Sequence, residues 1–152
     1  MKFFNKLSKW YFTKKSLPYW CIFLIDCSVV FLSYMFIYQQ LNSGIKTLGV
    51  LPNLSILIGC FTFFHAIGFR LFHTYDGILR YSSFIDLQRV FYAVVCGAAI
   101  SSVSYPMLHN IDKFDHINLD YKNIILASLL STLVLWAIRV IAKTIFDVSL
   151  SD

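Results

Sequence analysis

Apolar residues run along this 152-residue chain in four long blocks separated by short polar segments. The blocks cover residues 17–41, 51–72, 90–108 and 122–142. A bilayer core about 30 Å thick needs roughly 20 apolar residues of α-helix, and each block is about that long. Because lipid offers no hydrogen-bond partners to the backbone, such spans form helices. The pattern therefore predicts an all-α membrane protein, a four-transmembrane-helix bundle with antiparallel neighbours.

A short basic segment precedes the first block. Residues 1–15 place apolar and basic side chains at separate helical positions, namely Phe3, Leu7, Trp10 and Tyr11 against Lys2, Lys6 and Lys9. This spacing favours an amphipathic helix that lies on an anionic leaflet. The alternative is a disordered basic leader that only sets topology. We expect a membrane domain over residues 16–146 and a cytoplasmic tail over 147–152, which follows the fourth block without a strong stop.

Composition and charge agree with a lipid environment. Hydrophobic residues make up 58% of the chain and charged residues 14%, whereas globular domains carry about 25% charged residues. The net charge of +5 does not indicate a nucleic-acid partner, because the charges gather at the ends of the blocks. With four spans, ten of the thirteen lysines and arginines lie on the same side of the membrane as the N-terminus. The positive-inside rule then places both termini in the cytoplasm, with anionic headgroups as partners.

The connections between the blocks give weaker signals. Pro106 is expected to close the third span, and the segment from His109 to Tyr121 is polar, acidic and too short to fold alone. Ser83 followed by Asp86 is typical of a helix start, because a hydroxyl caps free amides and an acid suits the positive helix end. We expect this helix to continue into the third span.

Three ionisable side chains lie inside the predicted spans. Asp26 is nine residues into the first span, roughly 14 Å deep. A carboxylate there costs at least about 2.5–3.5 kcal/mol unless it is paired, protonated or hydrated. His65 and Arg139, in the second and fourth spans, are its candidate partners. The three form either a structural polar clamp between helices or a proton or substrate path, and the small number of groups favours the clamp.

Small residues mark a packing face on the third span. Ala93, Gly97 and Ser101 recur at four-residue intervals, a spacing that lets helix backbones approach closely. Their partner is another span of the same chain or a second copy, which would make a homo-oligomer; contact within the chain is the simpler interpretation. The cysteines form no C-x-x-C pair, so they predict small packing residues rather than a metal site or disulfides.

The segment before the third span carries the most specific pattern. Residues 75–87 read YDGILRYSSFIDL. They resemble the loop of the CapD-like polysaccharide biosynthesis proteins, where a pattern close to Y-x-G-x-x-R-Y-(S/T)-S-x-x-D-L joins spans two and three. An acid within the first span and the order of leader, spans and cytoplasmic C-terminus are also similar. The matching positions are Tyr75, Gly77, Arg80, Tyr81, Ser82, Ser83, Asp86 and Leu87.

This resemblance implies the membrane domain of a nucleotide-sugar 4,6-dehydratase or epimerase, whose NAD(P)-binding Rossmann domain would follow the fourth span. The sequence ends at Asp152 without a glycine-rich phosphate-binding turn. We therefore assign no catalytic, cofactor-binding or metal-binding residue, and expect NAD(P) only in a missing downstream domain. The predicted function is a non-catalytic membrane anchor or scaffold. Its expected partners are a Rossmann-type catalytic domain or subunit and membrane glycosyltransferases.

Two other functions stay open at this point. A small four-span transporter or flippase accessory for lipid-linked sugars would need a polar cavity lined by Asp26, His65, Ser101, Ser104 and Ser128. The membrane domain of an initiating sugar-phosphate transferase is a third interpretation, which the loop motif disfavours. A hydrated cavity around those side chains would indicate transport, and a closed helix contact would indicate anchoring.

Overall fold

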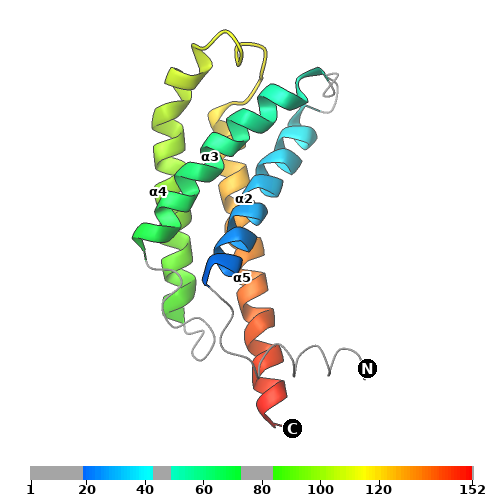
Figure 1. Cartoon of the computed structure of the whole chain (residues 1–152), viewed down its shortest axis with the longest axis vertical. Helices are drawn as coiled ribbons and strands as arrows, with labels where there is room; N and C mark the ends of the chain where they lie inside the picture. The colour runs from blue at the N-terminus through cyan, green and yellow to red at the C-terminus, as the bar shows by residue number, and fades with distance from the viewer. Residues whose placement is uncertain (1–18, 43–48, 73–83, 152) are drawn as a thin grey trace.

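The computed structural model describes residues 19–42, 49–72 and 84–151 (Figure 1). These residues form four α-helices: α2 (Tyr19–Leu41), α3 (Leu51–Leu71), α4 (Phe84–His109) and α5 (Tyr121–Ser151). All four are long and apolar enough to cross a membrane, which confirms the predicted all-α, four-span architecture. The predicted leader at residues 1–15 and the loop-motif positions 75–83 lie outside the described residues.

Two helices extend beyond the apolar blocks. The third span belongs to a 26-residue helix that begins at Phe84, six residues before the predicted apolar block, with Asp86 in its first turn. The third span is expected to end near residue 108, close to Pro106, and α4 ends at His109, three residues beyond that proline. At this position the ring removes the backbone donor of residue 106 and crowds the carbonyl group of Ser102 one turn back. α5 is 31 residues long and runs to Ser151.

The helices pack as a bundle in which neighbours along the chain are also neighbours in space. α2 packs against α3, α3 against α4, and α4 against α5, while α5 closes the ring by packing against α2. Figure 1 shows the start of α2 and the end of α5 at the same end of the bundle, with α5 projecting beyond it. The first and last spans therefore lie side by side.

Apolar side chains cover the outside of the bundle as well as its centre. Val30, Ile58 and Phe61 are fully buried, whereas Leu32 is 63% exposed and Val103 is 74% exposed. Similar exposed apolar side chains occur on all four helices. Such a surface is unfavourable in water, but it matches the hydrocarbon of a bilayer. The chain is an integral membrane protein whose outer surface contacts lipid.

The segment between α4 and α5 packs against one end of the bundle. Three of its apolar side chains are buried: Phe114, Ile117 and Leu119. The carbonyl oxygen of Asn118 accepts hydrogen bonds from the side-chain amides of Asn42, at 3.3 Å, and Asn123, at 3.2 Å. These bonds connect the residue that follows α2 to the first turn of α5. The segment that the sequence indicates as a polar loop thus also closes the core.

Candidate functional site: a buried ion pair and a central polar layer

Two oppositely charged side chains inside the bundle, Asp26 and Arg139, form an ion pair between α2 and α5. Arg139 Nη2 donates to Asp26 Oδ2 at 3.0 Å, and the two side chains are 9% and 4% exposed. The Arg139 Nε atom has no hydrogen-bond partner among the described residues. The structure therefore brings together two of the three predicted intramembrane residues, and the guanidinium neutralises the carboxylate that the sequence places within a span.

The ion pair lies inside the membrane-spanning region. Asp26 follows Tyr19, the first residue of α2, by seven residues, or about 10 Å along the helix axis. Arg139 precedes Ile145, where the fourth candidate span ends, by six residues, or about 9 Å. At this depth either charge alone would lie in a low-dielectric interior, out of reach of the headgroups, so the pair connects the first and last spans where charges are costly.

His65 belongs to a different environment. Its ring is fully buried, its Nδ1 atom lies 2.9 Å from the carbonyl oxygen of Phe61, and it packs edge-on against Tyr34 with ring centroids 5.6 Å apart. Tyr34 is eight residues beyond Asp26 on α2, which is about 12 Å along the axis. The structure thus places His65 against Tyr34 rather than with the ion pair.

The hydrogen bond to Phe61 determines which ring nitrogen of His65 carries the proton. A carbonyl oxygen only accepts, so Nδ1 must donate. In the neutral imidazole Nε2 is then an acceptor, and this buried atom has no hydrogen-bond partner among the described residues. A buried acceptor without a donor costs about 1–3 kcal/mol.

Each of the four helices contributes one polar side chain to this region. Tyr34, His65, Ser101 and Ser128 come from α2, α3, α4 and α5, and we call them the central polar layer. The Tyr34 hydroxyl lies near those of Ser128 and Ser101 but without hydrogen-bond geometry to a partner. Both serines donate to a carbonyl one turn back on their own helices, at 2.8 Å for Ser101 and 2.7 Å for Ser128. The layer therefore has no spare donor among its serines.

Small residues bring α3 and α4 into close contact beside this layer. A Cβ added at Gly97 would lie 2.7 Å from the Cα and Cγ atoms of His65, and one added at Gly68 would collide with the Ala93 carbonyl. The structure thus places the predicted stripe of Ala93, Gly97 and Ser101 inside the chain, with its two smallest members against α3. Sequence reasoning missed Gly68. The signal available was a small residue of α3 that faces the stripe once the two spans are set antiparallel.

The described end of the loop motif packs against α5. Asp86 and Leu87 lie in the first turn of α4, and Asp86 is 8% exposed. The indole Nε1 of Trp136 donates to the carbonyl oxygen of Leu87 at 3.0 Å, and its ring lies 6.4 Å from that of Phe91. This interhelical hydrogen bond, which the sequence analysis missed, fixes the start of α4 against α5.

The chemistry that this arrangement can perform is limited. The described residues contain no group of three or more His, Cys, Asp or Glu side chains that could hold a metal ion. His65 and Ser101 are 0% exposed, and Ser128 is 8% exposed. A hydrated path would leave side-chain surface that a water molecule could touch. These residues form a closed helix contact.

The chain has no match among the family models, curated proteins and solved structures with which it was compared. Evidence for a function therefore comes from the described residues and from the loop motif in the sequence.

Proposed function

We propose that this chain is the membrane anchor or scaffold domain of a surface-polysaccharide biosynthesis protein. The resemblance of residues 75–87 supports the link to nucleotide-sugar 4,6-dehydratases and epimerases. The bundle would hold such an enzyme, as a fused domain or a separate subunit, at the cytoplasmic leaflet. Tethering raises the local concentration of the sugar product near membrane glycosyltransferases and requires no chemistry from the spans.

The closed central polar layer is the observation that favours anchoring over transport. Transporters bind substrate near the bilayer midplane, commonly where helices are interrupted. Here α3 and α4 pass the layer as unbroken helices, and His65 and Ser101 are inaccessible to water. A substrate path through this centre would require the Gly97 contact with His65 to open.

The proposal includes an orientation with both termini in the cytoplasm. Among the described residues, the end of the bundle where α2 starts carries the cations Arg70, Arg89 and Lys143. The opposite end carries Asp112, Asp115 and Asp120 beside Lys113 and Lys122. This asymmetry supports a cytoplasmic start of α2. The projecting end of α5 would then give a helical connection to a cytoplasmic partner.

Cell fractionation tests the anchoring function. In source cells that lack only the codons for residues 1–152, NAD(P)-dependent UDP-sugar dehydratase or epimerase activity should move from the membrane pellet to the supernatant. Where the enzyme is a separate subunit, supplying the chain on a plasmid should return that activity to the pellet. An unrelated four-span protein expressed at the same level is the control for membrane crowding.

The outcomes of this experiment separate the two leading functions. Activity that stays in the pellet after deletion, together with lipid-linked sugar accumulating on the cytoplasmic leaflet, would replace the anchor with a transport accessory. Alkaline phosphatase fused after Ser151 tests the orientation independently, because the enzyme is active only outside the cytoplasm. An active fusion at that position would contradict the proposed topology.

A further inference from the structure

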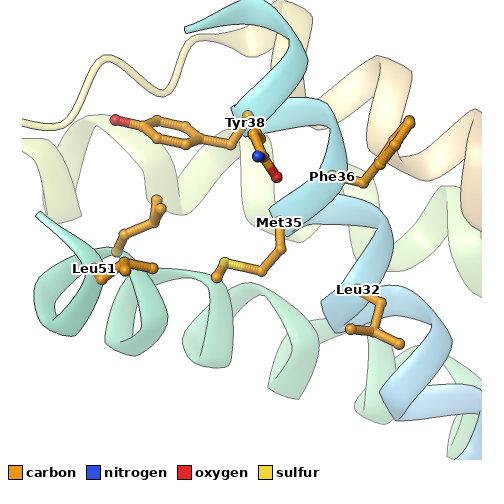
Figure 2. Close-up of a pocket in the computed structure, with 7 residues that line it drawn as sticks. Leu32, Met35, Phe36, Tyr38 and Leu51 are labelled. Carbon is orange, nitrogen blue, oxygen red and sulfur yellow. The ribbon is translucent and has the colours of Figure 1, made fainter. Parts of the chain in front are cut away.

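A groove opens between α2 and α3 near the end of the bundle opposite the ion pair. It has a volume of about 550 Å³ and is lined mainly by apolar side chains, among them Leu32, Met35, Phe36 and Leu51. Figure 2 shows Met35 reaching from α2 toward α3, with Leu51 on the facing helix. Gln39 lines the same groove and is exposed.

The groove lies within one half of the bilayer. Gln39 lies two residues before Leu41, where the first candidate span ends, so the groove begins at the membrane interface. Leu32 lies nine residues before that end, or about 14 Å along the helix. Half of a hydrocarbon core about 30 Å thick has nearly the same depth. The groove therefore runs from the interface to about the midplane.

The outer walls of the groove are continuous with the lipid-facing surface. Leu32 is 63% exposed and Phe36 is 52% exposed, so a lipid chain can enter sideways from the bilayer. At the interface end, the Gln39 carboxamide both donates and accepts hydrogen bonds. The lining thus changes from apolar at depth to polar at the interface. A phospholipid changes in the same direction, from its acyl chains to its headgroup.

We infer that this groove binds one acyl chain of a phospholipid from the leaflet on its own side, with the headgroup beside Gln39. An unfilled groove in hydrocarbon would forfeit dispersion contacts along both walls. The apolar lining at depth and the Gln39 carboxamide at the interface end match the acyl chain and the headgroup of one phospholipid. This inference is independent of the proposed function.

Photocrosslinking tests the occupant. The full chain is reconstituted in vesicles of phosphatidylethanolamine and phosphatidylglycerol, with a trace of phosphatidylethanolamine that carries a diazirine on one acyl chain. Crosslinked positions are mapped by mass spectrometry. We expect Met35 and Leu51 to be labelled about three- to tenfold more than Val103 and Leu129, because a chain held between two helices exchanges more slowly than one on an open face. Val103 and Leu129 are lipid-facing positions outside the groove, at 74% and 55% exposure.

Two results would overturn the inference. Equal labelling of the groove and of Val103 would show ordinary bilayer contact only, and labelling of Met35 and Leu51 well below that of Val103 would show that a protein segment occupies the groove. A filling variant gives a second test. In native mass spectrometry we expect a one-to-one phospholipid adduct of the wild type. Met35→Trp should lose this adduct, whereas Val103→Trp should keep it, with equal helical content by circular dichroism. Retention of the adduct in Met35→Trp would also refute the assignment.

Discussion

Substituting Asp26→Leu should destabilise the bundle by about 3–5 kcal/mol, the range found when one partner of a buried ion pair is removed. Arg139 is 9% exposed, and it would lose the acceptor that lies 3.0 Å from Nη2. Its Nε already has no hydrogen-bond partner among the described residues, so the remaining charge would be poorly compensated. Asp26→Asn keeps an amide oxygen, and we expect it to cost about 1–2 kcal/mol.

The double variant Asp26→Leu/Arg139→Leu makes this prediction specific to the ion pair. With both charges replaced by apolar side chains, stability should return to within about 1 kcal/mol of the wild type. Reversible unfolding in mixed micelles, titrated with sodium dodecyl sulfate and followed by circular dichroism, measures all four proteins. Two results would refute the reasoning: Asp26→Leu within about 1 kcal/mol of the wild type, or a double variant no more stable than that single variant.

Three further predictions use the same unfolding assay. Gly97→Ala should lower the free energy of unfolding by about 1–3 kcal/mol because the added methyl group meets His65. The control Gly59→Ala has nothing within 4 Å of its added Cβ, so it should be neutral or stabilising by up to about 1 kcal/mol. Equal effects of the two substitutions would contradict the close contact between α3 and α4. Tyr34→Phe should be neutral or slightly stabilising, because the hydroxyl removed is buried without a partner, and a loss above about 1 kcal/mol would reveal a hydrogen bond. Asn123→Ala should cost about 1 kcal/mol by freeing the segment between α4 and α5, and faster amide hydrogen exchange there would accompany it.

The sequence predicts the architecture of this protein well, because length and hydrophobicity determine which segments can cross a bilayer. It also identifies Asp26 and Arg139 as intramembrane charges. It does not decide between Arg139 and His65 as the partner of Asp26. That choice depends on how the helices are rotated and shifted relative to one another. Because apolar side chains surround each span, the sequence does not indicate which face of the helix packs inward.

Features that depend on contacts between distant residues were harder to predict. Gly68 carries no distinguishing pattern until α3 is set against Ala93 on α4. The hydrogen bond from Trp136 to the Leu87 carbonyl joins residues 49 positions apart, and an indole inside a span is equally consistent with contact to lipid. Pro106 shows the limit of a local signal: it indicates the region in which α4 ends, but the last residue of the helix is His109.

The ion pair joins residues 113 positions apart in the chain, and this separation has a consequence for synthesis. At roughly 5–20 residues per second, the ribosome needs about 6–23 s to reach Arg139 after Asp26 has been made. During that time the first span must enter the membrane or wait at the insertion machinery with its carboxylate protonated, hydrated or bound to a chaperone. A nascent chain that stops after three spans would therefore hold the Asp26 carboxylate within the membrane without its Arg139 partner. Quality-control proteases could use that difference to distinguish it from the finished protein.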